Sequence, residues 1–463
     1  MQRLRITVLA GFACLLLAAA PRAGAAPATA VLPCSEGAER ATLTESVRLH
    51  PSSAYTGGFD ITASNVVLDC RGATIDGTGR GGTGILIGAP ADADLSGVVI
   101  RNCAVRGFLN GIRITRDGFR GLGAGHEYEH GIRDVVIERS RVSDSRGVGI
   151  FVDGYVTRTT IRDTTVTRAG SSGIYLEAGS AGNVVTRNAI LRNGFGENGP
   201  AGDVFSFSGA RFRFWGIGRE GLSVDGSRRN LVSSNRFEGN SAGGVFLYTN
   251  CGEYVRSRPE RWFERRYGAD DNVIARNRFK GGVNGVWVAS RMGESTLPMG
   301  CSDPAYVERG LKRITLDRAA RNRLLRNSFR DVTYGVRVED DDTKVLANRF
   351  AGPDATHHAV VIGTPERTAA LGRPVRGTVL VRNSSAIRGN PFPYRWVEGE
   401  ADTVVARNRA LGRRVGICEA ETLPRGPFVM TLAFALEPEG SPVTPAPDLT
   451  VPTVGALAPC SRG

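Results

Sequence analysis

The fold of this chain is decided by residues 135–188, which read VVIERSRVSDSRGVGIFVDGYVTRTTIRDTTVTRAGSSGIYLEAGSAGNVVTRN. The segment VVIER at 135–139, followed by GIFVD at 149–153, returns as TTIRD at 159–163, followed by GIYLE at 173–177. It begins again as VVTRN at 184–188. We equate positions 139, 163 and 188, which are 24 and then 25 residues apart. A period of roughly 20 to 50 residues is typical of stacked repeat architectures.

Each repeat contains a short strand that begins with glycine and carries aliphatic residues at its second and fourth positions. The aliphatic pairs are Ile85/Ile87, Ile112/Ile114, Ile150/Val152, Ile174/Leu176, Leu222/Val224, Val245/Leu247, Val286/Val288 and Val336/Val338. Alternation of this kind predicts a strand with one buried face, because successive side chains point to opposite sides. Equivalent strands recur too rarely for a hairpin meander, so we expect them to pair parallel, one per coil.

A second strand precedes each glycine-led strand and ends in a repeated Arg-Asn pair. The pairs are Arg101-Asn102, Arg187-Asn188, Arg276-Asn277, Arg326-Asn327, Arg382-Asn383 and Arg407-Asn408, with Asn235 and Asn348 in the same position. Asn tolerates the left-handed conformation of a tight corner, and its amide can bond to the next Asn in a stack. Two residues later come Phe237, Phe279, Phe329 and Phe350, which we expect to stack inside the coils.

These features resemble the right-handed parallel β-helices of the pectin-lyase-like superfamily and the NosD-like repeat proteins within it. The resemblance covers roughly residues 56 to 410 and implies an all-β fold: a single-stranded right-handed parallel β-helix, or solenoid, with long loop insertions and a Pro-rich C-terminal tail. We expect a signal peptide at 1–25, an N-terminal cap at 26–55, the β-helix at 56–410 and the tail at 411–463. One solenoid accounts for the length of 463 residues, because it grows by adding coils.

The N-terminus predicts export. Two arginines precede an apolar run from Ile6 to Ala20, and Ala23-Gly24-Ala25 is a signal-peptidase pattern. No other apolar run reaches membrane-spanning length, so we expect a secreted or periplasmic protein with no integral membrane anchor. The net charge of +13 favours an anionic partner. For an exported monomer without a nucleic-acid motif, we expect an anionic polysaccharide and no nucleic acid.

Seven cysteines remain after the signal segment, and an oxidising compartment favours disulfides. Cys251 and Cys301 lie in long loops on neighbouring coils and are the first pair we expect. A bond between Cys34 and Cys70 would tie the cap to the first coil. No cysteine pair has Cys-x-x-Cys spacing, so no metal site is expected.

Five insertions interrupt the repeat next to the glycine-led strands, at 116–133, 194–220, 249–270, 290–320 and 364–377. Long loops at coil corners commonly carry function. We expect them to form walls on both sides of the glycine-led sheet, which would then be the floor of a groove.

The outward positions of the glycine-led strands should line that floor. The third positions are Arg113, Phe151, Tyr175, Ser223, Phe246, Trp287 and Arg337, and the fifth positions are Thr115, Asp153, Glu177, Asp225, Tyr248, Ala289 and Glu339. Aromatic faces bind sugars, and carboxylates carry out glycosidic chemistry. We therefore predict Asp153, Glu177 and Asp225 as catalytic. The predicted substrate-binding residues are Phe151, Tyr175, Phe246, Tyr248, Trp287, Arg113, Arg291, Arg337, Glu339, His126 and His130.

Two mechanisms fit these acids. Carboxylates on neighbouring rungs stand about 5 Å apart and those two rungs apart about 10 Å, which brackets the spacings of retaining and inverting glycosidases. Polygalacturonase-like β-helices resemble this arrangement, but their motifs Asn-Thr-Asp, Asp-Asp, His-Gly and Arg-Ile-Lys are absent. Resemblance to pectate-lyase-like β-helices implies instead a lyase or epimerase in which acids hold Ca²⁺ and an arginine takes the proton. The Asp-Pro-His-Asp motif of mannuronan epimerases is missing.

Other interpretations remain open. The aromatic column is alternatively the surface against which the insertion 194–220 packs. The segment His126 to His130 matches the pattern His-Glu-x-x-His of zinc proteases, which requires a helix, but glycines on both sides favour a loop. The rival function from another class is a non-catalytic β-helix that binds a glycan or another cell-surface component.

Overall fold

The computed structural model describes residues 30–32, 40–250, 263–419 and 433–436. Gaps within these ranges lie at 52, 79–80, 198, 201, 208–209, 264, 291–292, 296–305, 310–311, 316–317, 366, 369–371 and 398–400. The expected signal segment, the Pro-rich segment at 437–459, Arg291 and the expected Cys251–Cys301 pair lie outside the described residues. No helix within the described ranges is long and apolar enough to cross a membrane.

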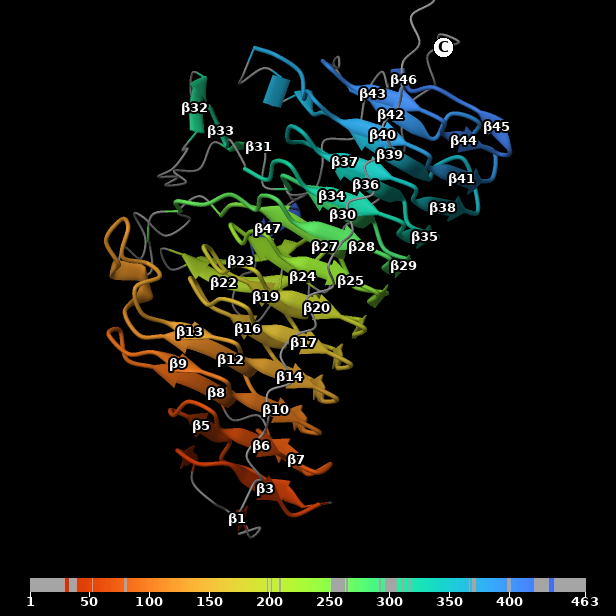
Figure 1. Ribbon diagram of the computed structural model, residues 1–463. Coiled ribbons are helices and arrows are strands. Elements are labelled where there is room, and N and C mark those ends of the chain that lie inside the picture. The colour runs from red at the N-terminus through yellow and green to blue at the C-terminus, as the bar shows by residue number, and fades with distance from the viewer. Residues whose placement is uncertain are drawn as a thin grey trace, which may run out of the picture.

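The chain winds into a solenoid whose coils each contribute one strand to each of three sheets (Figure 1). The Gly-led sheet contains the predicted glycine-led strands. Its described strands are β2 (Ala41–Leu43), β5 (Phe59–Ile61), β8 (Thr83–Ala89), β12 (Asn110–Arg116), β16 (Ile150–Val152), β19 (Ile174–Leu176), β24 (Glu220–Asp225), β27 (Gly243–Tyr248), β30 (Asn284–Val288), β36 (Tyr334–Val338), β39 (His358–Ile362), β42 (Tyr394–Trp396) and β46 (Cys418–Glu419).

Two further sheets close the coil. The Arg-Asn sheet comprises β1 (Ala30–Leu32), β3 (Val47–Leu49), β6 (Val67–Asp69), β10 (Val99–Arg101), β14 (Val136–Glu138), β17 (Thr160–Arg162), β20 (Val184–Thr186), β25 (Leu231–Ser233), β28 (Val273–Ala275), β34 (Arg323–Leu325), β37 (Lys344–Leu346), β40 (Val379–Val381) and β43 (Val404–Ala406). The Phe sheet comprises β4 (Ala54–Tyr55), β7 (Thr74–Asp76), β11 (Ala104–Arg106), β15 (Arg141–Ser143), β18 (Thr165–Thr167), β21 (Ala189–Leu191), β26 (Arg236–Glu238), β29 (Arg278–Lys280), β35 (Ser328–Arg330), β38 (Arg349–Gly352), β41 (Ser384–Ile387), β44 (Arg409–Ala410) and β45 (Arg413–Arg414).

The strand register confirms the repeat and corrects one spacing. Parallel pairing aligns Glu138 with Arg162 and Arg162 with Thr186, so both spacings between the repeats in residues 135–188 are 24 residues. Position 163 therefore corresponds to 187, one residue earlier than predicted. Strands of the segment 30–55, which was expected to be a cap, also pair within the three sheets.

The predicted aliphatic pairs form the core. All sixteen side chains are 0% exposed, and each aligns with its counterpart on the next coil, as Ile150 does with Ile174. A β-branched or leucine side chain in such a column is buried on every side, and this burial is the main stabilising term of folding.

The phenylalanines stack as predicted, and their stack explains the leading glycines. Ring centroids lie 4.9 Å apart between Phe237 and Phe279, 4.7 Å between Phe279 and Phe329 and 4.8 Å between Phe329 and Phe350. A Cβ at Gly335 would come within 2.5 Å of the Phe350 ring. Glycine is needed because any side chain there would collide with the aromatic stack.

The asparagine ladder is confirmed. Asn102 is left-handed as predicted, with a φ of 55°, but in the later coils the left-handed residue is not the asparagine. Asn235 donates to Asn277 at 3.0 Å, and Asn277 donates to Asn327 at 3.1 Å. In these later coils the positive φ belongs to the preceding residue, such as Arg276 at 56°. The asparagine turns inward instead, where its amide satisfies buried backbone groups of the corner, including the carbonyl oxygen of Val232.

The disulfide prediction is wrong for Cys70. This residue bonds to Cys103, one coil further on, with a Cα–Cα distance of 4.8 Å. This distance equals the spacing of neighbouring rungs, so the bond joins the two coils without displacing the backbone.

The insertions form small additional sheets beside the Gly-led sheet (Figure 1). The insertion 194–220 contributes β22 (Asp203–Phe207) and β23 (Ala210–Trp215), and the C-terminal strand β47 (Ala433–Leu436) pairs antiparallel with β23. The insertion 290–320 contains β31 (Gly293–Ser295), β32 (Tyr306–Arg309) and β33 (Lys312–Thr315). The first insertion holds the 3₁₀ helix η1 (Phe119–Gly121) and β13 (Ile132–Arg133), which pairs with β9 (Leu95–Ser96).

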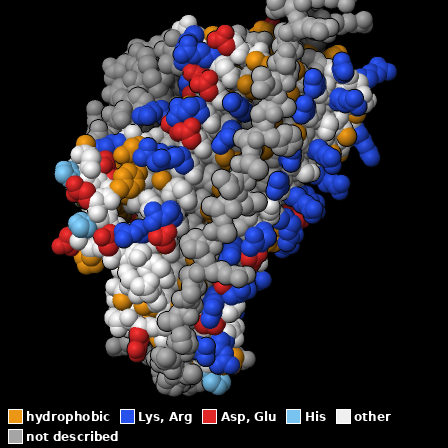
Figure 2. All heavy atoms as spheres, viewed as in Figure 1, with side chains coloured by type: hydrophobic (Ala, Val, Ile, Leu, Met, Phe, Trp, Pro, Cys, Tyr) orange, Lys and Arg blue, Asp and Glu red, His pale blue; other side chains and the backbone are white. Residues whose placement is uncertain are grey.

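Basic side chains follow one edge of the solenoid. Figure 2 shows Lys and Arg running along the right-hand side of the molecule, over the strands of the Phe sheet and the corners beside it. Many of these arginines pair with a carboxylate one coil away, as Arg187 does with Asp163 at 2.7 Å. The positive charge is therefore distributed along the stack.

Candidate functional site

The outward positions of the Gly-led sheet align as predicted. The register pairs Arg113 with Phe151, Phe151 with Tyr175, Phe246 with Trp287 and Trp287 with Arg337. Asp153, Glu177 and Asp225 directly follow or end three strands that are consecutive in this sheet. The predicted column of aromatics and the predicted run of three acids are both present.

The prediction that this column faces an open groove is wrong for the later coils. Phe246, Tyr248 and Trp287 are at most 1% exposed and form an apolar cluster with Ile217 at the end of the insertion 194–220. Arg337 lies 3.8 Å from the centroid of Trp287 and bonds to Glu339 at 2.7 Å, and both charged residues are buried. The insertion covers this part of the sheet, as the alternative interpretation expected.

An aromatic strip remains partly open on the earlier coils. Phe151 and Tyr175 are half-buried, with ring centroids 5.0 Å apart and planes inclined by 52°. The guanidinium of Arg113 lies 5.1 Å from the Phe151 ring. This strip, made by Arg113, Phe151 and Tyr175, is the part of the predicted floor that a ligand can approach from solvent.

The three acids form a buried cluster beside the strip. Asp153, Glu177 and Asp225 are 0%, 6% and 0% exposed, and we call them the acid cluster. Arg113 donates twice to one oxygen of Asp153, at 3.0 and 2.7 Å. The hydroxyl of Tyr175 donates to Asp225 at 2.8 Å. Strip and cluster are thus joined by direct hydrogen bonds.

A cover closes the acid cluster, and its contacts were not predicted from the sequence. It consists of Phe119 and Arg120 from η1 with Phe263 and Arg265 from the insertion 249–270. The Phe119 and Phe263 rings meet edge to face at 5.5 Å. Arg120 and Arg265 each place a nitrogen 3.7 Å from Oε1 of Glu177.

The cover is fastened by a second ion pair. Arg266 donates to Glu127 at 2.8 Å and to the carbonyl oxygen of Leu122 at 3.1 Å. Glu127 is 2% exposed, so this pair ties the first insertion to the segment 265–267 in a water-poor environment. The sequence signal for Phe263, Arg265 and Arg266 is the run of arginines and aromatic residues around residue 265. This run does not follow the repeat, so the sequence alone does not show which coil it covers.

Burial sets the protonation of the cluster. Burial raises the pKa of Glu177 to about 7, and the negative charge of Asp153 acts in the same direction, against Arg265 and Arg120. Burial also raises the pKa of Asp153, opposed by Arg113. Within the described residues, Oε2 of Glu177 and Oδ1 of Asp153 accept no hydrogen bond. A buried carboxyl that titrates near neutrality can act as a general acid or base.

The residues around the acids do not fit a Ca²⁺ site. Calcium in proteins takes six to eight oxygen ligands, whereas here guanidinium groups face all three carboxylates. In the part of the chain that the structure describes, no group of three His, Cys, Asp or Glu residues is placed to hold a metal.

The two histidines lie away from the acids. His126 to His130 forms turns, so the imidazoles do not share a helix face as a zinc protease requires. His126 pairs with Glu129 at 2.8 Å and His130 lies 3.6 Å from Asp94, both at the surface.

A second buried polar cluster was not predicted. Arg219 bonds to Glu197 at 3.0 Å, to Glu220 at 3.3 Å and to the hydroxyl of Tyr248 at 3.1 Å. These contacts hold the end of the insertion 194–220 on the Gly-led sheet. We interpret the cluster as structural, because Arg219, Glu220 and Tyr248 bond to one another.

Comparison with known proteins agrees with this architecture. A family model described as right handed beta helix region matches residues 52–297. A search of curated proteins gave no match. Solved structures with similar folds include the A-module of mannuronan C-5 epimerase AlgE6 from Azotobacter vinelandii, at 13% identity and a TM-score of 0.46, covering 82% of this chain and 91% of that chain.

Two other solved structures extend the comparison. The catalytic unit of a GH87 alpha-1,3-glucanase from Streptomyces thermodiastaticus has 11% identity and a TM-score of 0.46, over 80% of this chain and 62% of that one. The Dettilon tailspike protein has 14% identity and a TM-score of 0.43, over 82% of this chain. This chain spans 62% of the tailspike's length. These likenesses concern the fold alone. Because the family match covers more than half of its residues, the chain belongs to the right-handed β-helix family.

Proposed function

We propose that this protein is an exported carbohydrate-active enzyme, a polysaccharide hydrolase or a lyase or epimerase, that acts on an extended anionic glycan at the early coils of the Gly-led sheet. One observation carries the proposal: Glu177 is buried between two further carboxylates, and its pKa is raised to about 7. A buried carboxyl group with a raised pKa lowers stability when it ionises, and such groups concentrate at catalytic sites.

For hydrolysis, the cluster supplies both carboxyl roles. Glu177 keeps its proton up to about pH 7 and donates it to the leaving-group oxygen. The partner carboxylate is Asp153 or Asp225, each one rung away and therefore about 5 Å from Glu177 along the stack. That separation favours the retaining mechanism, in which the partner attacks the sugar directly.

For elimination or epimerisation, Glu177 acts as a general base instead of a general acid. Ionised Glu177 takes the proton next to the uronate carboxyl, and Arg113 or Arg265 balances the uronate charge. The reaction then runs faster above pH 7, whereas general-acid hydrolysis runs faster below it. No step requires Ca²⁺ in either scheme.

The substrate approaches along the half-buried strip. Phe151 and Tyr175 offer apolar ring faces to sugar C–H groups, and they lie directly beside the acids that follow them in the chain. A sugar reaches Glu177 when Phe119 and Phe263 move apart, since these two rings close the cluster. Exclusion of water by such a cover strengthens the electrostatic interactions beneath it.

The rival function is a non-catalytic β-helix that binds a glycan or another surface component. The specific observation in its favour is that Asp153 is fully buried and already bound by Arg113. In that case the cluster only fastens the cover to the sheet, and the exposed surface does the binding.

Amide substitutions decide between the two. Glu177→Gln, Asp153→Asn and Asp225→Asn are assayed for turnover and binding on a panel of bacterial and algal polysaccharides. The proposal expects turnover to fall at least a hundredfold while binding stays. Asp163→Asn is the matched control, because Asp163 is an exposed carboxylate that pairs with an arginine one coil away. Glycan binding by the unmodified protein, with turnover absent on every substrate, would establish the rival.

Product analysis separates the reaction types. A lyase forms an unsaturated sugar that absorbs ultraviolet light, a hydrolase forms a new reducing end without that absorbance, and an epimerase leaves the chain length unchanged. Treatment with a chelator tests the expected role of Ca²⁺: loss of activity would contradict the poor fit of the acid cluster to that ion.

A further inference from the structure

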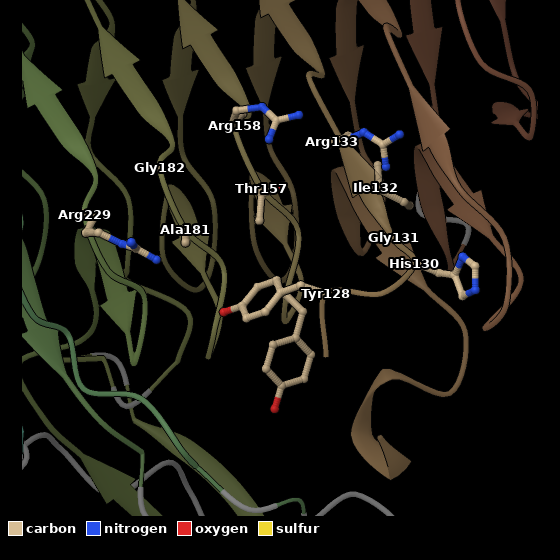
Figure 3. A pocket seen from close by; sticks show the side chains of 11 residues that line it. Tyr128, His130, Gly131, Ile132, Arg133, Thr157, Arg158, Ala181, Gly182 and Arg229 are labelled. Atoms are coloured by element: carbon tan, nitrogen blue, oxygen red, sulfur yellow. The ribbon is translucent and has the colours of Figure 1, made fainter. Parts of the chain in front are cut away.

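A second, open pocket lies beside the cover, at the corner where the chain leaves the Gly-led sheet for the Arg-Asn sheet. Its volume is about 440 Å³, and its lining includes Tyr128, Tyr155, Arg133, Arg158, Gly182 and Arg229. Figure 3 shows Gly182 between Arg158 and Arg229, with Tyr128 below them. The size suits a small polar ligand such as one sugar residue.

The corner forms a regular column. Main-chain bridges align Arg133, Thr157, Ala181 and Arg228, so the residues that follow them stack as Asp134, Arg158, Gly182 and Arg229. Hydrogen bonds from Arg229 and Asp271 to the next coils extend the column to Asp271 and Arg321. All six residues have a positive φ, between 55° and 66°.

From Asp134 to Arg321, charge alternates along this column except at one place, and further along the column Gly377 stands between Asp342 and Asp402. Arg158 bonds to Asp134 at 2.7 and 2.6 Å, and Arg321 bonds to Asp271 at 2.9 and 3.0 Å. Between Arg158 and Arg229, where the alternation calls for a carboxylate, stands Gly182. Within the described residues, the exposed Arg229 makes no ion pair.

The missing side chain leaves space for an anion. A Cβ built on Gly182 would meet only Cγ of Arg158, at 3.8 Å. Arg158 and Arg229 are two rungs apart, so their backbones are separated by about 10 Å. The guanidinium of Arg158 is already held by Asp134 on the preceding coil, so an oxyanion at Gly182 meets Arg229, whose guanidinium can bind carboxylate, sulfate or phosphate in bidentate fashion.

The surroundings remain positive after every visible carboxylate is considered. Arg133 lies 2.9 Å from Asp94, which His130 also faces, and Asp271 is held by Arg321. Arg228 adds a further cation 3.8 Å from the centroid of Tyr267. An anion at Gly182 would offset part of the positive charge that Arg228 and Arg229 leave at this corner.

We propose that this pocket binds an anionic sugar residue, with its acidic substituent between Arg158 and Arg229 at Gly182. The sugar ring lies against Tyr128, which is 39% exposed and meets Tyr155 edge to face at 5.7 Å. Tyr155 in turn packs on Phe119 of the cover, so a glycan held here continues toward the acid cluster. The assignment of the ligand to a glycan rests on the proposed function, whereas anion binding does not.

Titration calorimetry on the full chain tests the pocket, with an oligouronate, a sulfated oligosaccharide, a neutral oligosaccharide of equal length and inorganic phosphate as probes. We expect one of the two charged oligosaccharides to bind at least tenfold more tightly than both the neutral oligosaccharide and phosphate. Equal affinity for phosphate would overturn the sugar assignment, and equal affinity for the neutral oligosaccharide would overturn the role of the anion.

Gly182→Asp supplies the carboxylate that the column lacks. The variant should fold, because Asp134 and Asp271 adopt the same left-handed conformation in the same column. It should weaken binding of the charged oligosaccharide at least tenfold, as should Arg229→Gln. Arg321→Gln is the control, since it removes an arginine of this column that already pairs with Asp271 outside the pocket. Unchanged binding in Gly182→Asp would refute the proposal.

Glu177→Gln keeps the two proposals distinguishable. Binding in this variant should equal that of the unmodified protein if the pocket is the binding site. If binding persists and no variant ever shows turnover, the pocket stands and the enzymatic proposal fails. If turnover is present but Gly182→Asp and Arg229→Gln leave both binding and turnover unchanged, the pocket proposal fails alone.

Discussion

Replacing Glu177 with glutamine should make the protein more stable at alkaline pH. Burial raises the pKa of Glu177 from 4.5 to about 7, so the folded protein binds this proton more tightly than the unfolded chain does. Stability is therefore fully present below pH 4.5 and falls as the pH rises through about 7. The total cost is about 3 kcal/mol, and most of it appears between roughly pH 5 and 9.

The measurement is urea unfolding of the unmodified protein and Glu177→Gln at pH 5 and pH 9. The unmodified protein should lose roughly 2 to 3 kcal/mol more than the variant over this interval, since the amide has no proton to release. Glu238→Gln is the matched control. A hydrogen bond from Lys280 lowers the pKa of Glu238, so removing this surface carboxylate should give no gain at high pH.

Two results would refute the reasoning. If both proteins lose the same stability between pH 5 and pH 9, the pKa of Glu177 is not raised, and the proton-donor role falls with it. If Glu177→Gln is less stable than the unmodified protein at pH 9, the ionised carboxylate is a structural partner of Arg265 and Arg120. A gain in stability with a loss of turnover is the pattern expected of a catalytic group.

Three further predictions concern the scaffold. Burial lowers the pKa of His358 from 6.5 to about 4, so stability should fall by about 3 kcal/mol as the pH drops through this range, and thermal unfolding should show a smaller loss in His358→Phe. Asn277→Ala breaks the ladder and leaves buried polar groups unpaired, which should lower the free energy of unfolding in urea by about 3 kcal/mol, whereas a neutral result would show that the ladder is dispensable. Cys103→Ser opens a loop of 33 residues and should cost about 3 to 4 kcal/mol, the same loss that a reducing agent causes in the unmodified protein.

Most of the coil could be read from the sequence because a solenoid repeats its environments. Each residue of a column meets the equivalent residue one coil away, so alternating Ile and Val, the asparagines and the phenylalanines reveal their neighbours directly. Local conformation was harder to assign. The left-handed corner falls on Arg276 and not on Asn277, because the inward amide is needed by the buried backbone.

The sequence by itself determined the repeat, the three-residue run of acids and the outward aromatic column. Only the tertiary structure decided which of these outward residues meets water, because the groups that cover them come from aperiodic insertions distant in the chain. Ile217 seals the column at Trp287, and Phe263 and Arg265 close over Glu177. The absence of a carboxylate at Gly182 could also be recognised only from the structure. The coils differ in length, so the sequence does not show that Arg158 and Arg229 lie on the coils next to Gly182.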